Sequence, residues 1–273
     1  MIHIIPKNHD KTMRNIRLDL EYDGRNYCGW QWQPNQFTIE QTLKEAIEKL
    51  LCNPIKLYSS GRTDSGVHAE QHVAHFMSDT TLKQKNLLGG LNSILPDDIA
   101  VYRVLDMPHD WSARYNAIER EYRYTFYCNP YPNVFFKPWT YHVKYPIDIE
   151  AMRKAAKYLE GEHDFTSFRS THCDADNPVR TMLELSFRQD GDLLHFCVRG
   201  HAFLRHQVRT FAGTLLEVGL GRLDADAIPG ILAAKDRHKA GHTIAAHGLT
   251  LVAVRFEGDH ERFKDEKRPL RFP

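Results

Sequence analysis

Residues 55–77 read IKLYSSGRTDSGVHAEQHVAHFM and place an acidic loop between two segments with the pattern of strands. Apolar and polar residues alternate before the loop, and residues 72–77 after it are mostly apolar, which predicts a strand on each side. Within the loop, Gly61 and Gly66 allow the sharp turns that would present Asp64 at the tip. A carboxylate on a loop between two rigid elements is in a favoured position for catalysis.

The tetrapeptide at residues 61–64 also has a simpler interpretation. Asp and Gly are common in turns for local reasons, so Asp64 could cap a nearby amide while Arg62 is solvated. These four residues alone favour the ordinary turn, and the rest of the chain has to distinguish the two interpretations.

Outward from this loop, the chain shows the order strand, helix, strand, strand, helix, strand twice. Thr38, with Gln41 three residues later, has the spacing of a capping box for the first helix. Two such series are typical of the split-βαβ, ferredoxin-like arrangement. The sequence predicts an α+β fold of two ferredoxin-like halves with antiparallel sheets flanked by helices, and a cleft between the halves. The expected elements span residues 14–22, 39–51, 55–58, 72–77, 82–94 and 99–105, then 119–128, 148–159, 179–188, 193–199, 203–218 and 249–256, with a short helix after Asp224.

The length of 273 residues, with 42% hydrophobic residues, allows one large domain or two of ordinary size. The two halves could form sheets that lie side by side or join into one. The expected divisions are an N-terminal tail at 1–13, a first half at 14–105 with the Asp64 loop, a connection at 106–118, a second half at 119–256, and a charged C-terminal tail at 257–273.

The composition argues against membrane and disulfide-rich classes. No apolar run approaches the roughly 20 residues that span a bilayer, and the polar start lacks the apolar centre of a secretory signal. The five cysteines are far apart and form no Cys-x-x-Cys pair. We therefore expect a cytoplasmic protein with reduced thiols and no membrane association.

Charge is informative through its distribution, because the net charge of +1 alone does not favour a polyanionic partner. Residues 193–216 contain no acidic residue, while three arginines and three histidines occur among them: Arg199, Arg205, Arg209, His195, His201 and His206. Such a basic face could bind phosphates, or it could simply be solvated.

Three histidines near the Asp64 loop suggest a metal site, since His68 and His72 have the spacing of the His-Glu-x-x-His zinc motif. Glu70 is one position too late for the usual general base, and the segment containing His72 and His75 reads as a strand. We therefore expect no metal. A His-ligated metallohydrolase remains an alternative that metal analysis would decide.

Tyr122, Tyr124 and Phe126 form an alternating stripe, which predicts a sheet core for at least two of them. Tyr122, near the start of its strand, could instead present its ring to a nucleobase, where stacking contributes about 1 to 3 kcal/mol. A non-catalytic RNA-binding module with Tyr122 as a stacking platform is therefore a second alternative.

Arg205 and Arg209 would share one face of the expected helix at 203–218, where like charges at this spacing repel. Arg209 lies toward the apolar end of that face, so we expect it to need a fixed anion. Asp64 is the candidate partner, and the pair would keep its carboxylate ionised at neutral pH. The alternatives are structural pairs with Glu184 or Glu217.

Seven motifs in order resemble the TruA-type tRNA pseudouridine synthases, and they cover residues 14–256. They are EYDGRNYCGWQ at 21–31, GRTDSGVHA at 61–69, SARYNA at 112–117, REYRY at 120–124, GEHDFTSFR at 161–169, FLRHQVR at 203–209, and HGL with the following strand at 247–254. Residues 241–246 depart from the family's usual Pro-rich version, which bears on the rim of the pocket.

The resemblance implies an isomerase that converts uridine to pseudouridine in the anticodon stem-loop of tRNA, without metal or organic cofactor. Asp64 would be the essential carboxylate, acting on the ribose or on the uracil ring, and Arg209 would pair with it. Tyr122 would pack on the target uracil and could help remove the C5 proton. Arg62 would hold the nucleotide out of its helix or loop, at a cost of a few kcal/mol, and Arg205 is a further candidate for substrate contact. A homodimer sharing one tRNA is also implied.

Overall fold

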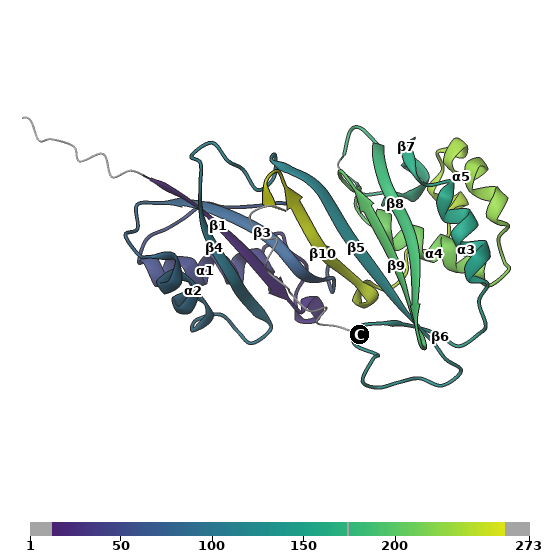
Figure 1. Ribbon diagram of the computed structural model, residues 1–273, viewed down its shortest axis with the longest axis horizontal. Coiled ribbons are helices and arrows are strands. Elements are labelled where there is room, and N and C mark those ends of the chain that lie inside the picture. The colour runs from purple at the N-terminus through teal and green to yellow at the C-terminus, as the bar shows by residue number, and fades with distance from the viewer. Residues whose placement is uncertain (1–12, 174, 260–273) are drawn as a thin grey trace, which may run out of the picture.

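The computed structural model describes residues 13–173 and 175–259, which form one large sheet flanked by helices (Figure 1). The predicted α+β class is confirmed. The strands are β1 (Arg14–Tyr22), β2 (Leu57–Ser59), β3 (His68–Ser78), β4 (Ile99–Met107), β5 (Ala117–Cys128), β6 (Tyr141–Val143), β7 (Gly161–Asp164), β8 (Val179–Asp190), β9 (Leu193–Gly200) and β10 (Leu249–Phe256). The α-helices are α1 (Ile39–Leu51), α2 (Gln84–Asn92), α3 (Ile149–Lys157), α4 (Gln207–Gly219) and α5 (Ile228–Ala234). Single 3₁₀ turns lie at Gly24–Asn26, Thr166–Phe168, Ala225–Ala227, Arg237–Lys239 and Ala246–Gly248.

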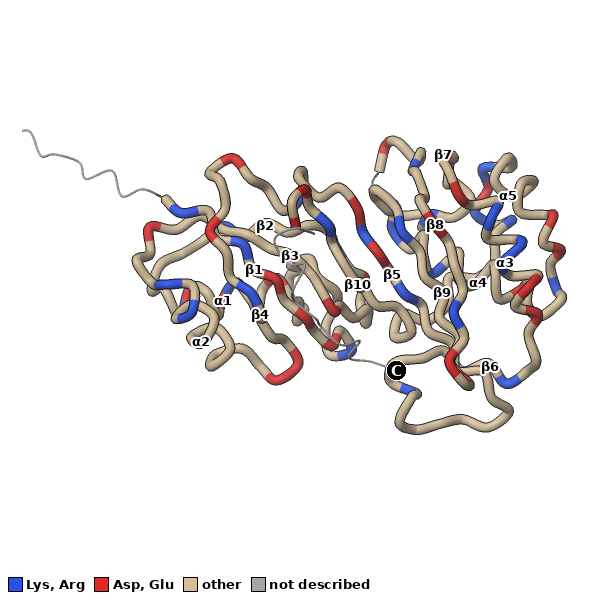
Figure 2. Tube along the Cα trace, in the orientation of Figure 1, with Lys and Arg blue, Asp and Glu red and all other residues tan. Residues whose placement is uncertain are grey.

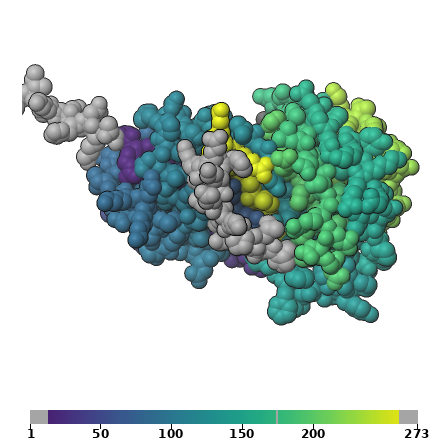
Figure 3. Space-filling model, viewed as in Figure 1, coloured from purple at the N-terminus to yellow at the C-terminus, as the bar shows by residue number. Residues whose placement is uncertain are grey.

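The last strand joins the two halves. The strand order is β4-β1-β3-β10-β5-β9-β8-β7, with β2 paired to β3 and β6 to β5. β10 pairs parallel with β3 and antiparallel with β5, and it lies between the first and second halves in the space-filling view (Figure 3). The two sheets therefore join into one, which was one of the two expected arrangements. The proposed domain limits, with a connection at 106–118, stay a prediction.

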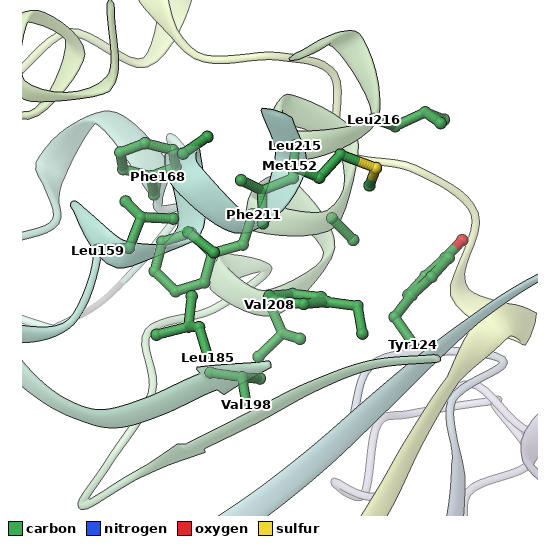
Figure 4. Close-up of a cluster of buried hydrophobic side chains, with 14 of the residues drawn as sticks. Tyr124, Met152, Leu159, Phe168, Leu185, Val198, Val208, Phe211, Leu215 and Leu216 are labelled. Carbon is green, nitrogen blue, oxygen red and sulfur yellow. The ribbon is translucent and has the colours of Figure 1, made fainter. Parts of the chain in front are cut away.

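Each half has its own buried core. The first lies between α1, α2 and the strands β1, β3 and β4, and the second between α3, α4 and the strands β5, β8 and β9. Figure 4 shows the second core, where Phe211 of α4 points toward Leu185 and Val198 on the sheet. Tyr122 packs partly against both clusters, which places it at the junction of the halves.

Local signals gave several elements correctly. Thr38 caps α1 by accepting a hydrogen bond from the Gln41 amide at 3.3 Å. Of the two hydrogen bonds of the predicted capping box, this is the one found among the described residues. The hairpin of β8 and β9 turns at Gly191, whose φ is +57°. The short strands β6 and β7 were not predicted, because three or four residues give no clear period. Residues 1–12 and 260–273, most of the two expected tails, lie outside the described residues.

The predicted helix at 203–218 begins later than expected. His206 has a φ of +66°, a left-handed conformation that an α-helix cannot contain, so α4 starts at Gln207. Arg205 therefore lies before the helix, and the predicted shared face of Arg205 and Arg209 is wrong. The two charges are therefore not at the i and i+4 positions of one helix, and the expected repulsion between them is absent.

The basic face expected from residues 193–216 is only partly present. Arg199 forms ion pairs with Glu119 at 3.2 Å and with Glu184 at 2.9 Å on the neighbouring strands, and His195 is buried. Figure 2 shows acidic and basic residues interspersed along these strands. The sequence count overstated the positive charge, because it could not show which carboxylates lie across the sheet.

No helix within residues 13–173 and 175–259 is long and apolar enough to span a lipid bilayer.

Three buried histidines make the stability dependent on pH. Burial lowers the pKa of His72 to about 3 and the pKa values of His75 and His195 to about 4, from 6.5. Between those values the unfolded chain binds protons that the folded chain excludes, so the stability falls as the pH drops.

We expect the free energy of unfolding, measured with urea from about pH 7 to about pH 4.5, to decrease with acidification. His195→Gln should flatten this dependence by up to about 1.4 kcal/mol per pH unit. His109→Gln, at an exposed position, should leave it unchanged. An unaltered slope in the His195 variant would contradict the assignment of a neutral buried imidazole.

Candidate active site

The loop that carries Asp64 is fixed by the backbone of residues 27–30. The Trp30 amide donates to the Thr63 carbonyl at 3.0 Å, and the Gly66 amide donates to the Tyr27 carbonyl at 3.3 Å. These two bonds hold the loop on both sides of Asp64. The carboxylate is therefore presented by a restrained segment, and of the two glycines expected to allow sharp turns, Gly66 has a positive φ of +78°.

Gly29 permits this close approach of two backbone segments. Its φ is +87°, and a Cβ at this position would lie 2.5 Å from the Thr63 carbonyl oxygen. Any side chain would both strain the backbone and displace the loop next to Asp64.

A buried polar cluster of Tyr22, Thr63 and His72 contacts the loop. The Tyr22 hydroxyl lies 2.8 Å from Thr63 Oγ1 and 2.9 Å from His72 Nδ1. The Trp30 ring stacks on His72 with the centroids 3.8 Å apart. Since a buried hydroxyl requires hydrogen-bond partners, these contacts favour the observed position of Thr63 and so restrain the adjacent Asp64.

Asp64 and Arg209 form the predicted ion pair. Arg209 Nη1 lies 3.1 Å from Asp64 Oδ2, and Arg209 Nε donates to the Ile244 carbonyl at 2.8 Å. The side chains of Asp64 and Arg209 are 22% and 15% exposed, so the pair is mostly shielded from water. The two alternative acids have other partners, since Glu184 pairs with Arg199 and Glu217 with Arg222.

His206 is a further member of this group that the sequence analysis did not assign to the site. Its Nε2 atom lies 3.7 Å from Asp64 Oδ2. Burial lowers the pKa of His206, Asp64 raises it, and Arg209 and Arg205 lower it further. The imidazole is therefore mainly neutral at pH 7. The sequence predicted His206 inside a continuous helix, whereas its backbone is left-handed and its side chain lies near Asp64.

Tyr122 lies half-buried on β5, between Val198 of β9 and Leu251 of β10. Its ring meets the edge of Phe203 with the centroids 5.0 Å apart. Burial raises the pKa of Tyr122 to about 12; Arg120 opposes the rise and Asp64 adds to it. The hydroxyl is therefore protonated at neutral pH.

The other two members of the aromatic stripe belong to the core, as predicted. The Tyr124 and Phe126 side chains are fully buried, and the Tyr124 hydroxyl donates to the Ala245 carbonyl at 2.7 Å.

Arg62 and Arg205 lie at exposed positions. Arg205 Nη1 donates to the His172 carbonyl at 3.2 Å, outside the group formed by Asp64 and Arg209. Their predicted roles in substrate contact stay predictions, and their exposure leaves both available to a large ligand.

The three histidines near the loop have separate partners. His68 contacts Asp23 at 3.1 Å, and His72 belongs to the cluster under the loop. His75 stacks on Tyr58 with the centroids 5.0 Å apart. Within the described part of the chain, no group of three or more His, Cys, Asp or Glu residues could hold a metal ion.

The loop and the ion pair lie within the segments that a known protein family shares. The sequence model of a family described as tRNA pseudouridine synthase matches residues 20–116 and 155–257. Asp64 falls in the first segment, and Tyr122 falls between the two. The chain belongs to the tRNA pseudouridine synthase family.

Particular relatives carry the same name in three organisms. The chain is 43% identical over 242 residues to tRNA pseudouridine synthase A of Geotalea daltonii, covering 89% of this chain and 99% of that protein. It is 40% identical over 242 residues to the protein of this name in Acetivibrio thermocellus, covering 89% and 99%. It is 41% identical over 238 residues to that of Halalkalibacterium halodurans, covering 87% and 90%.

The contact between Gly29 and the Asp64 loop gives a testable result. Gly29→Ala should lower both the free energy of unfolding and the catalytic turnover, because the new methyl group would displace Thr63. Gly191→Ala is the matched control, since Gly191 also has a positive φ but no atom lies within 4 Å of its Cβ position. The control should cost about 1 kcal/mol of stability and leave turnover intact. Equal losses of activity in the two variants would contradict the account of the loop.

Proposed function

We propose that this protein isomerises uridine to pseudouridine in tRNA, and that its target lies in the anticodon stem-loop. The proposal is supported by the family membership and by the relatives named tRNA pseudouridine synthase A. The observation that carries it is the Asp64–Arg209 pair on a restrained loop, inside the segments matched by the family.

The reaction breaks the bond between C1′ and N1 of uridine and forms a bond between C1′ and C5. One proton leaves C5 and N1 gains one, so the product is an isomer of the substrate. The carboxylate of Asp64 acts on the ribose or on the uracil ring while Arg209 holds it in position. The neutral imidazole of His206 is a second group beside it that can accept a proton.

Tyr122 packs against the target uracil in this proposal. With its pKa raised to about 12, its hydroxyl can donate a hydrogen bond but cannot act as a free phenolate at neutral pH. Help from Tyr122 in removing the C5 proton therefore requires the hydroxyl to pass its own proton to an acceptor in the same step, and N1 is the atom that ends the reaction protonated. The half-buried ring supplies an apolar surface for the base.

The target uridine has to leave its stacked position to reach Asp64, which costs a few kcal/mol. The exposed Arg62, two residues before Asp64, is placed to hold the extruded nucleotide, and Arg205 is a second candidate. A homodimer that shares one tRNA, and a cytoplasmic location with the substrate, complete the proposal. No metal or organic cofactor takes part in it.

Asp64→Asn should abolish pseudouridine formation in unmodified tRNA and leave tRNA binding largely intact, because the amide keeps the shape of the side chain but loses its charge. The measurement is carbodiimide labelling of the RNA before and after incubation, since substrate and product have equal mass. Asp226→Asn is the control, at a carboxylate that is 56% exposed and pairs with Lys154.

Two outcomes of this assay oppose the proposal. Activity near wild type in the Asp64 variant would refute the role of this carboxylate. Tight binding by the wild-type protein with no new carbodiimide adduct would instead favour the non-catalytic RNA-binding module.

A further inference from the structure

A pocket lies beside the group formed by Asp64, Arg209 and His206, because His206 also lines it. Its volume is about 380 Å³, within the range of ligand sites in proteins. His206 belongs to its wall, and the same side chain has Nε2 3.7 Å from Asp64 Oδ2. A ligand in the pocket would therefore lie next to the reacting nucleotide. The lining residues are Ser170, Thr171, His206, Arg237, His238, Ala240, His242 and Thr243.

The lining contains an arginine and three histidines and no acidic side chain. Asp236, which precedes Arg237 in the sequence, accepts a hydrogen bond from the His238 amide at 2.9 Å and caps the 3₁₀ turn at Arg237–Lys239. The hydroxyls of Ser170, Thr171 and Thr243 add neutral polar groups to the same wall. The pocket therefore combines positive charge with hydrogen-bond donors, which is the chemistry that binds phosphate.

Arg237 is a half-buried cation whose hydrogen-bond partners are neutral, which favours an anionic ligand in the pocket. Its guanidinium donates to the Ala240 carbonyl at 3.4 Å and to Thr243 Oγ1 at 2.8 Å, and both acceptors are neutral. Within residues 13–173 and 175–259 it forms no ion pair, although it is half-buried and burial lowers its pKa. A shielded guanidinium without a counter-ion is costly, and an anion in the pocket would remove that cost.

The segment at 240–244 that lines the pocket packs on α4, the helix that carries Arg209. The Gly241 amide donates to Thr214 Oγ1 at 2.9 Å, and a Cβ on Gly213 would lie 1.9 Å from the His242 carbonyl oxygen. Ile244, at the end of this segment, accepts the hydrogen bond from Arg209 Nε. The distance between the pocket and the reacting carboxylate is therefore set by the packing of one segment on α4.

We propose that this pocket binds a backbone phosphate of the RNA immediately next to the target uridine, with Arg237 as the main contact. The inference rests on the proposed function, because it takes the strand that carries the extruded uridine as the ligand. Phosphodiester groups are the anions that an RNA strand carries, and those flanking the target uridine would lie near the pocket. Arg237 binds one with its planar fork, and the hydroxyls and histidines of the wall surround it. The contact positions the strand and reads no base.

The first test compares two arginines of equal charge. Arg237→Gln should raise the Kd for an unmodified anticodon stem-loop RNA about tenfold and reduce the slope of log Kd against log salt by about 0.7 to 1. Arg222→Gln, at an exposed arginine paired with Glu217, should change neither quantity. Arg237→Lys keeps the charge but loses the fork, so it should restore the salt slope more than the affinity. Unchanged affinity and slope in Arg237→Gln would overturn the proposal.

The second test identifies the phosphate. Stem-loop RNAs carry one neutral methylphosphonate linkage, either 5′ or 3′ of the target uridine, and each is bound to wild type and to Arg237→Gln. One linkage should weaken wild-type binding about tenfold and have no further effect in the variant. Equal losses in both proteins, or no loss at either linkage in wild type, would overturn the contact. A purely structural role of Arg237 would change folding or turnover without this coupling.

These measurements separate the inference from the proposed function. Pseudouridine formation by wild type and its loss in Asp64→Asn report on the function alone. The methylphosphonate coupling is read from affinity and requires no turnover. Wild-type RNA binding with no isomerisation, but with the coupling intact, would reject the function and keep the phosphate site.

Discussion

The ion pair between Asp64 and Arg209 is the interaction on which the rest of the site depends. It joins a loop of the first half to a helix of the second half, with Oδ2 and Nη1 3.1 Å apart. A half-buried charge of either sign would be costly alone, so each side chain requires the other to be in place. β10 pairs with β3, which follows the Asp64 loop, and with β5 of the second half, so the strand that joins the halves also helps to hold the two sides of the pair together.

Several further features serve the same geometry from different directions. The hydrogen bonds among Tyr22, Thr63 and His72 hold the loop through the Thr63 side chain, and the close contact with Gly29 holds it through the Thr63 backbone. On the helix side, the Ile244 carbonyl orients Arg209. The carboxylate is therefore held before any substrate arrives, which is what a preorganised site requires.

Local patterns in the sequence were sufficient for most helices and strands, because apolar period and capping residues act over a few positions. The glycines marked residues 61–66 as a loop, but the role of Asp64 came from the family resemblance, because residues 61–64 alone favour an ordinary turn. Arg209 was paired with Asp64 because an unpaired, partly buried arginine is costly. The start of α4 was missed because nothing in the sequence marks the left-handed backbone of His206. No local signal predicted that Arg199 pairs with acids on neighbouring strands, because these contacts join distant segments. The same holds for Arg237, whose neutral hydrogen-bond partners are known only from the structure.

A double-mutant cycle on the ion pair tests the central claim most directly. Single-turnover rates of pseudouridine formation are compared for wild type, Asp64→Asn, Arg209→Gln and the double variant. If Arg209 acts by holding the Asp64 carboxylate, the second substitution should add no further loss once the carboxylate is gone. Independent, multiplicative losses, or an Arg209→Gln variant with the wild-type rate, would contradict the account.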